Sequence, residues 1–216
     1  MDLSQLEATL RAHLVERLNA HGSDSAHDLL HLERVVATAR RIGPEEGADM
    51  AVVIPAAWLH DYVVVPKDDP RRSQASRLAA VAARDYLASI NYPAHLLDNI
   101  AHAIEAHSFS AGIPATTLEA KVVQDADRLD GIGAIGIARC LVTGGAMNRA
   151  LYSADDPFCA TRQPDDARFT IDHFYSKLFK TAASMQTGAG RREAERRVEV
   201  MKRWLAELGR EIGQPC

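Results

Sequence analysis

Apolar residues recur at helical spacing over most of the chain, most clearly near its C-terminal end. There they follow one another at steps of four and three, at Ala194, Val198, Met201, Leu205, Leu208 and Ile212. This spacing places them on one face of a helix, while Arg196, Arg203 and Arg210 fall on other faces. The pattern predicts an amphipathic helix that packs on a core.

The same spacing predicts helices over most of the remaining sequence. The predicted helices span residues 4–19, 26–41, 49–61, 73–90, 93–107, 117–129, 131–143, 170–184 and 190–212. Three of them begin with a capping box, in which a hydroxyl side chain accepts a backbone N–H and an acid reaches back to the cap. These boxes are Ser4 with Glu7, Ser25 with Asp28, and Thr116 with Glu119. Sustained period-two alternation is missing, so the predicted fold class is all-α.

Two segments lack a helical pattern. Val63 to Val65 is β-like but ends at Pro66, which favours a loop over a strand. Residues 144–169, rich in Gly, Pro and Asp, form the longest irregular stretch and are predicted to be a lid or a surface loop.

Length and composition are those of an ordinary globular protein. The chain has 216 residues, of which 47% are hydrophobic and 25% are charged. We expect one domain over residues 1–216, a helical bundle with a core at about 22–145 and C-terminal helices at about 170–212 packed on it. The net charge of −4 argues against a nucleic acid polymer as partner, because such binding is driven by basic patches. A small molecule that carries phosphate stays possible.

Targeting signals and metal-binding cysteines are not expected. The uncharged stretches 50–60 and 108–118 are shorter than the roughly 18 apolar residues of a membrane-spanning helix. The N-terminal residues lack the basic-then-apolar pattern of a signal peptide, so a cytoplasmic protein is expected. The cysteines, Cys140, Cys159 and Cys216, are far apart and are expected to be reduced thiols outside any metal site.

The segment Gly131-Ile-Gly133-Ala-Ile-Gly136 satisfies the GxGxxG pattern of dinucleotide-binding loops. That motif needs a preceding buried strand, and residues 124–130 are too polar to form one. The small residues are therefore predicted to let one helix approach another closely.

His27 and His31 are four residues apart, with Asp28 between them, so both imidazoles lie on one helical face. The pattern imitates the H-E-x-x-H motif of zinc proteases, although the acid here is one methylene shorter. A zinc protease therefore remains an alternative hypothesis.

The pair His60-Asp61 closes the apolar run Val52 to Leu59. Burying this pair is costly unless it is satisfied, either by a divalent cation or by a capping histidine with an ion-paired aspartate. His31 and Asp127 also end or interrupt apolar helix faces. Two imidazoles and two carboxylates together suit Mn²⁺, Fe²⁺, Mg²⁺, Ni²⁺ or Zn²⁺.

The order His31, His60-Asp61, Asp127 resembles the H…HD…D signature of the HD-domain superfamily of metal-dependent phosphohydrolases. Flanking phrases are similar to its small bacterial single-domain branch: His27-Asp28-x-x-His31-x-x-Arg34-Val35, Leu59-His60-Asp61, Ala106-His107-Ser108-Phe109-Ser110, Gln124 to Asp130, and Asp172-His173-Phe174-x-x-Lys177-Leu178. The resemblance covers about residues 22–210. It implies an all-helical fold and a divalent metal, and some relatives hydrolyse nucleoside triphosphates to the monophosphate and pyrophosphate.

On this resemblance we expect one divalent metal ion, Mn²⁺ being favoured, held by His31, His60, Asp61 and Asp127. Phosphoryl transfer also needs positive charge around the phosphoryl oxygens. The candidates for substrate binding, by their nearness to the ligands in the sequence, are Lys67, Arg34 and Arg72. The predicted substrate is a small phosphorylated compound, most simply a (deoxy)nucleoside triphosphate.

The identity of the base is left open by the sequence. Several HD hydrolases carry an acid soon after the HD pair, but residues 62–65 here are Tyr-Val-Val-Val. Besides Asp61, the catalytic candidate is Asp28, which either orients the attacking water or holds a ligand imidazole; Asp130 has the same ambiguity. A nucleotide monophosphatase, an alarmone hydrolase and a catalytically silent metal-binding sensor or interaction module remain alternatives.

His102 and His107 lie five residues apart, about 140° around a helix, so they cannot both face one ion unless the helix ends between them. Other branches of the superfamily bind a second metal with extra histidines in this interval, so a second metal stays an alternative. We expect a one-metal site, in which these two histidines line the pocket or make hydrogen bonds. The other histidines, His13, His21, His95 and His173, are expected to be structural or exposed.

Overall fold

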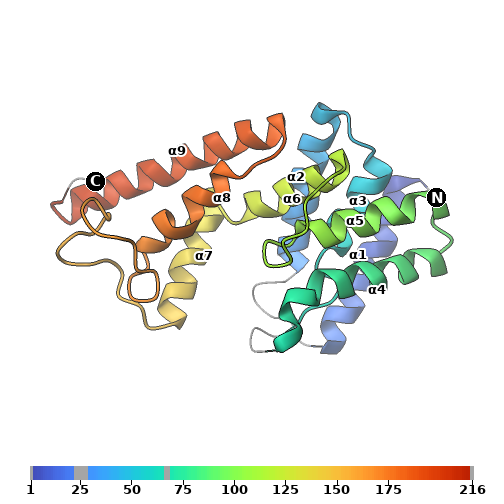
Figure 1. Cartoon of the computed structure of the whole chain (residues 1–216), viewed down its shortest axis with the longest axis horizontal. Coiled ribbons are helices and arrows are strands. Elements are labelled where there is room, and N and C mark those ends of the chain that lie inside the picture. The colour runs from blue at the N-terminus through green and yellow to red at the C-terminus, as the bar shows by residue number, and fades with distance from the viewer. Residues whose placement is uncertain (1, 22–28, 66–68, 215–216) are drawn as a thin grey trace. The chain divides into compact units, whose positions relative to one another are not determined.

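The computed structural model describes residues 2–21, 29–65 and 69–214. Within these ranges all regular structure is helical apart from one isolated bridge between Ala150 and Phe169, which confirms the all-α class. The chain divides into two compact units, residues 1–127 and 128–216, blue to yellow-green and yellow to red in Figure 1. That both units form one domain, with the C-terminal helices packed on the core, stays a prediction.

The first unit is built from α-helices joined by short turns. They are α1 (Leu3–His21), α2 (Leu29–Glu46), α3 (Met50–Leu59), α4 (Ala75–Ser89), α5 (Leu97–His107) and α6 (Leu118–Asp130), the last of which continues into the second unit. Short 3-10 helices, Pro70–Gln74 and Ala94–Leu96, lead into α4 and α5. Each predicted helix of this unit is present, with shifted ends.

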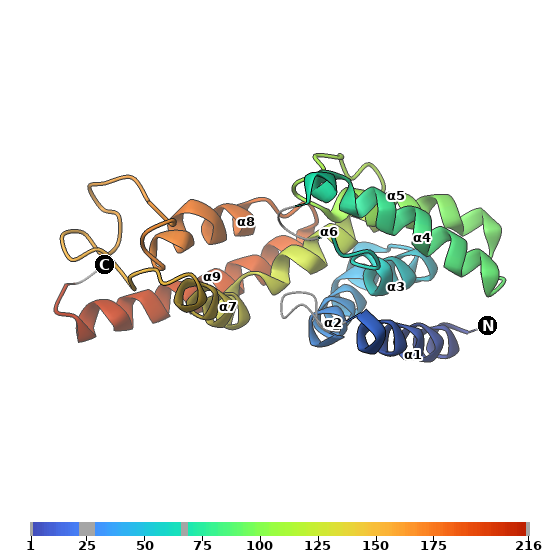
Figure 2. The same cartoon turned by 90° about the horizontal axis from the view of Figure 1, so that it is seen from below.

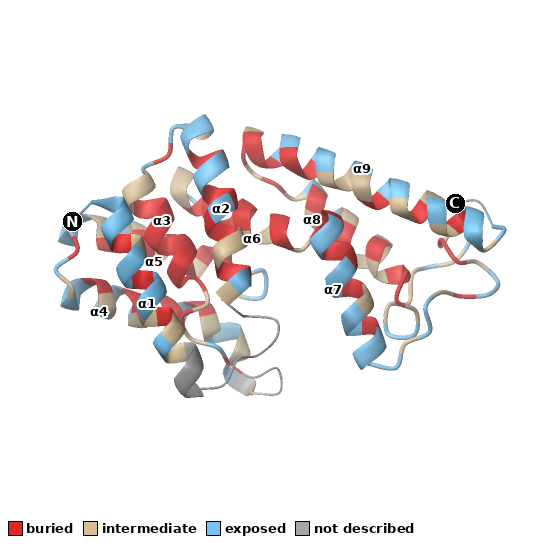
Figure 3. Ribbon diagram, turned by 180° about the vertical axis from the view of Figure 1, so that it is seen from behind, coloured by how far each residue is buried: buried red, intermediate tan, exposed pale blue. Residues whose placement is uncertain are grey.

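Helix α3 forms the centre of the first unit. Every residue from Val52 to Leu59 is buried, as expected of a helix that is apolar on all sides. It contacts α1, α2, α4 and α5. Figure 2 shows α3 between α4 and α1, and Figure 3 colours most of it as buried. Pro55 has no N–H for the Ala51 carbonyl, which instead accepts a hydrogen bond of 2.7 Å from the Tyr92 hydroxyl.

Two of the three predicted capping boxes were misplaced by one or two residues. At the start of α1, the Asp2 carboxylate accepts from the Gln5 N–H, and the Gln5 side chain accepts from the Asp2 N–H. This reciprocal pair replaces the one predicted between Ser4 and Glu7, because the helix begins earlier. At α6 the Thr117 hydroxyl caps the helix by accepting from the Ala120 N–H. The box predicted at Ser25 lies outside the described residues.

The second unit contains α7 (Gly133–Ala146), a π-helix (Phe174–Leu178), α8 (Phe179–Ala183) and α9 (Gly188–Glu211). Helix α9 contacts α7 and α8. Of its predicted apolar face, Ala194, Met201 and Leu205 are buried, and Figure 3 shows buried and exposed residues alternating along it. Trp204 of α9 stacks on Phe174 with ring centroids 5.6 Å apart.

The glycines of the GxGxxG segment allow a turn between α6 and α7 and close packing of α7 and α9. A helix, α6, precedes it where a dinucleotide-binding loop would need a strand. Gly133 has a φ of 74°, which favours glycine, and a side chain there would lie 3.0 Å from Arg197 of α9. A Cβ at Gly136 would lie 2.4 Å from the Gly131 carbonyl oxygen. These close approaches agree with the packing interpretation.

The irregular segments lie where the sequence placed them. Residues 61–65 are turn and coil, and between α7 and the π-helix the chain is irregular. Cys140 and Cys159 are free thiols. Among the described helices, none alone is both long and apolar enough to cross a membrane; only the bent pair of α6 and α7 taken together meets that test, on length and composition.

Candidate metal centre

Three helices of the first unit bring the predicted ligands to one place. His31 lies on the buried face of α2, His60 directly follows the last residue of α3, and Asp127 lies in the last turn of α6. Asp61 follows His60 in the turn after α3. Because α3 is anchored by its apolar residues on every side, the position of its end is fixed by core packing.

The four side chains converge on one point. The Nε2 atoms of His31 and His60 lie 3.2 Å apart. An Asp127 oxygen lies 3.5 Å from the His31 Nε2 and 3.8 Å from that of His60, and an Asp61 oxygen lies at 3.8 and 3.5 Å from the same atoms. Atoms bound at right angles to an ion about 2.1 Å away would be about 3.0 Å apart.

The hydrogen bonds of His60 determine which nitrogen is available to an ion. Its Nδ1 lies 2.8 Å from the Ala57 carbonyl oxygen, which can only accept, so Nδ1 carries the hydrogen. The Nε2 lone pair of the neutral ring therefore faces the cluster. Burial lowers the His60 pKa and outweighs the opposing effect of the Asp61 charge, which keeps the ring neutral.

His107, at the end of α5, also reaches the cluster. Its Nδ1 donates to the Ile104 carbonyl at 2.6 Å, and its Nε2 lies 3.6 Å from an Asp61 oxygen. Burial alone would lower the His107 pKa, but the hydrogen bond to Asp61 and the charges of Asp61 and Asp127 raise it above its ordinary value. The sequence left open whether His107 lines the pocket, makes a hydrogen bond or binds a second metal.

The donor set fits a divalent ion. Among the described residues, two groups have ligand atoms close enough to share a metal: His31, His60 and Asp127, and His60, Asp61 and His107. In the metal-free protein a single proton can lie between the Nε2 atoms of His31 and His60, and an ion would take its place. The buried imidazoles and the more exposed carboxylates leave one side open to solvent. The identity of the metal stays a prediction.

Other predicted site residues have different surroundings. Asp28 and Lys67 lie outside the described residues, as does His27. Arg72 donates to the Val65 carbonyl at 2.9 Å, beyond the turn that holds Asp61. Arg34 lies on α2, half-buried, one turn after His31. Their roles in substrate binding stay predictions.

Two residues that closely follow Asp127, Arg128 and the candidate Asp130, have partners in the second unit. Arg128 donates to the Ser184 carbonyl and hydroxyl at 3.1 and 3.0 Å. The Asp130 carboxylate is buried and accepts from Arg139 at 3.0 Å. Both side chains therefore take part in contacts that hold the helices of this unit together.

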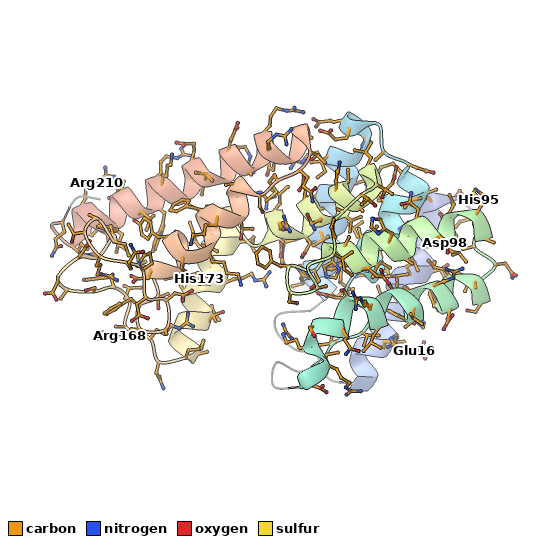
Figure 4. All side chains as sticks on the ribbon, in the orientation of Figure 1. Glu16, His95, Asp98, Arg168, His173 and Arg210 are labelled. Atoms are coloured by element: carbon orange, nitrogen blue, oxygen red, sulfur yellow. The ribbon has the colours of Figure 1, made fainter. Side chains whose placement is uncertain are left out.

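Among the described side chains, the remaining histidines take part in structural contacts or are exposed, whereas the His21 side chain lies outside the described part of the structure. His102 forms hydrogen bonds with the N–H and hydroxyl of Thr116 at 3.1 and 2.9 Å, so it does not share the site of His107. His95, labelled in Figure 4, is exposed in the short 3-10 helix that leads into α5, and His173, labelled there too, pairs with Asp166 at 2.7 Å. His13 is half-buried against Tyr62.

The fold and this cluster define a class of helical proteins with a histidine and aspartate metal centre. The chain belongs to the HD domain family, whose match covers residues 29–132. That segment contains His31, His60, Asp61, His107 and Asp127, and it begins after α1. The zinc-protease alternative is set aside, because the partners of His31 come from α3 and α6.

Several relatives are similar over nearly their full length. The chain is 33% identical over 192 residues to the protein YpgQ of Bacillus subtilis, which covers 87% of this chain and 85% of YpgQ. The solved structure of YpgQ in complex with ADP has a TM-score of 0.74 at 31% identity, covering 96% and 95% of the two chains. An HD-superfamily hydrolase from Bacillus thuringiensis has a TM-score of 0.77 at 27% identity, covering 97% and 98%.

Proposed function

We propose that this protein is a divalent-metal-dependent phosphohydrolase that cleaves a (deoxy)nucleoside triphosphate to the monophosphate and pyrophosphate. The observation that carries the proposal is the convergence of His31, His60, Asp61 and Asp127 in a cluster where the closest imidazole nitrogens are 3.2 Å apart. The nucleotide class is supported by the relative YpgQ, whose solved structure holds ADP.

A divalent ion bound in this cluster would lower the pKa of a bound water, so that hydroxide is available near neutral pH, and would polarise a phosphoryl oxygen. Asp61 and Asp127 bring the negative charge that the ion balances, and the neutral His60 ring brings a lone pair. We favour Mn²⁺, since these oxygen and nitrogen donors suit it among several first-row ions.

The chain's own residues handle the substrate and the proton. In the proposed reaction the water oxygen bonds to the α-phosphorus, the bond to the bridging oxygen breaks, and pyrophosphate leaves with the electron pair. Asp28 takes the proton of the attacking water, and Arg34, Lys67 and Arg72 offset the phosphate charge. His107 holds Asp61 in place through the contact between its Nε2 and the Asp61 oxygen at 3.6 Å.

The test is a screen of metal-stripped protein against Mn²⁺, Fe²⁺, Mg²⁺, Ni²⁺ and Zn²⁺ with nucleoside triphosphates, monophosphates and alarmones. Reaction in ¹⁸O-labelled water with product identification separates the alternatives. The proposal requires pyrophosphate and label in the nucleoside monophosphate. Orthophosphate from a monophosphate would identify a monophosphatase, and pyrophosphate from an alarmone would identify an alarmone hydrolase.

A silent metal-binding sensor is the second candidate. Tyr62 to Val65 stand where several HD hydrolases carry an acid, and Tyr62 and Val65 are buried. Metal binding without turnover of any of these substrates would favour the sensor. The variant Asp28→Asn tests the base: if it leaves turnover unchanged, Asp28 is not that base.

A further inference from the structure

We propose that α1, which precedes the matched family segment, positions the metal-binding carboxylate of Asp61 through a clamp on the next residue, Tyr62. The clamp consists of His13 and Arg17 on α1 and Tyr86 on α4. The inference rests on the metal centre proposed above, and it assigns a role to a helix that carries none of the ligands. Figure 4 labels Glu16, the neighbour of Arg17 on α1.

Arg17 holds Tyr62 by its backbone and by its ring. The Arg17 guanidinium donates to the Tyr62 carbonyl at 3.4 Å, and its central carbon lies 4.2 Å from the centroid of the Tyr62 ring. The Tyr62 N–H donates to the Leu59 carbonyl at 3.1 Å. Tyr62 is only 8% exposed, so these contacts fix a buried side chain rather than a surface one.

His13 holds the other end of the same ring. Its Nε2 and the Tyr62 hydroxyl lie 2.6 Å apart in a hydrogen bond. The His13 ring stacks on Tyr86, with centroids 3.9 Å apart and planes inclined by 11°. Side chains from α1 and α4 therefore meet at the residue that follows Asp61.

The turn after α3 explains why Asp61 needs such a support. Residues 61–65 lie outside any helix, so α3 fixes the chain on one side of Asp61 only. Tyr62 supplies the fixed point on the other side, and Arg72 holds the far end of the turn through the Val65 carbonyl. Metal–ligand distances fall within about 0.2 Å of their standard values, so the position of this turn bears directly on metal affinity.

The experiment measures Mn²⁺ affinity of the metal-stripped full chain by calorimetry, without substrate. Arg17→Gln removes the charge and both contacts to Tyr62, and we expect about tenfold weaker binding, the scale on which residues that support ligands act. The matched control is Arg11→Gln on the same helix, where the exposed Arg11 pairs with Glu33 at 2.8 Å, and it should leave the affinity unchanged.

Two conservative variants distinguish positioning from general stability. Tyr62→Phe removes one hydroxyl and should weaken Mn²⁺ binding by less than Arg17→Gln. Arg17→Lys keeps a cation near the ring and should recover part of the affinity. The melting temperature of each metal-free variant is recorded beside its affinity, because a merely structural role would lower the melting temperature and leave the affinity of the folded protein unchanged.

The outcomes separate the clamp from the proposed function. Mn²⁺ binding by the wild type with unchanged affinity in folded Arg17→Gln overturns the clamp alone. A wild type that binds no divalent metal overturns the metal centre and the clamp together. If Arg17→Gln does not fold, Tyr62→Phe decides: weaker binding supports the clamp and unchanged binding overturns it. Loss of triphosphate hydrolysis is not used as a readout here.

Discussion

Each of the two units buries a group of charged or titratable side chains, and the groups differ in what surrounds them. In the second unit the fully buried Asp172 carboxylate accepts from the Arg162 guanidinium at 2.5 and 2.7 Å and from the Asp165 N–H at 2.6 Å. A fixed guanidinium balances its charge. The group is therefore a cross-link that holds the long loop of this unit.

In the first unit, imidazoles surround the carboxylates. The three buried rings of His31, His60 and His107 lie within 3.8 Å of an oxygen of Asp61 or Asp127, and the His60 ring is neutral. The partner therefore decides the role of a carboxylate that lies inside the protein. An arginine partner makes a structural link, whereas imidazoles, each of which can offer a nitrogen lone pair, make with the carboxylates a site that suits a cation.

The largest effect is expected from a substitution in the histidine and aspartate cluster of the first unit. Asp61→Asn should lower metal-dependent turnover by about 10³-fold, about 4 kcal/mol, because a ligand and a positioned charge are lost together. Steady-state kinetics at saturating Mn²⁺ checks this. Asp98→Asn is the control, since Asp98 lies on exposed α5 surface, labelled in Figure 4, and pairs only at the surface with Arg84. Equal turnover in both variants would contradict the site.

Removing the Asp172–Arg162 ion pair of the second unit should lower the stability of the fold and leave metal binding unchanged. Asp172→Asn leaves the Arg162 charge without its partner, and we expect a loss of about 3 kcal/mol in the free energy of unfolding, measured with urea. Asp155→Asn, at an exposed position of the same loop, should change it little. Mn²⁺ affinity should stay that of the wild type, and a large loss would contradict the division of roles between the two groups.

Metal removal should sharpen the contrast. At a free Mn²⁺ concentration of about 100 times Kd, binding adds about 2.7 kcal/mol to the free energy of unfolding, and a chelator should remove this gain. Asp127→Asn should abolish the gain, and Asp172→Asn should keep it. Thermal unfolding of both variants with and without the chelator measures the gain. A wild-type melting temperature that does not change with Mn²⁺ would contradict the metal centre.

The smallest effect concerns pH in the metal-free protein. His60, with a lowered pKa, destabilises the fold as the pH falls from 6.5 through its folded pKa, because only the unfolded chain takes up the proton there. His107, with a raised pKa, stabilises the fold below 6.5, and this contribution is lost as the pH rises through its folded pKa.

An NMR titration that follows the ring nitrogens of His60 and His107 measures their pKa values, which are expected to be shifted in opposite directions. The variant His107→Gln should reduce the free energy of unfolding below pH 6.5 more than it does in alkaline solution. The control is His95→Gln at an exposed position, which should show no such pH dependence. A His107 ring that titrates below that of His60 would reverse the proposed arrangement.

Much of the fold and site could be predicted because the signals are local. Helical spacing of apolar residues predicts α9, and the apolar run Val52 to Leu59 predicts α3. The ligand set was predicted from order along the chain, and the structure brings all of it together. Helix starts were less accurate at α1 and α6, because neighbouring residues such as Asp2 and Thr117 compete as caps.

Other features have no local signal. His102 and His107 share α5, yet only the fold shows that one binds Thr116 and the other faces Asp61. Nothing in the spacing of His13 and Arg17 marks their partner, since Tyr62 lies 49 residues from His13 in sequence. Contacts over such separations depend on how helices pack, and packing is a property of the whole unit.

The sequence by itself determined the helical class and the central apolar helix, because hydrophobic periodicity follows from the order of residues. Its resemblance to the HD superfamily supplied the four candidate ligands. The tertiary structure alone decided that His107 lies beside Asp61, that Asp172 is balanced by Arg162, and that α1 reaches the turn after Asp61. The physical reason is that a side chain's charge and hydrogen bonding depend on its neighbours in space, which close packing of distant segments assigns.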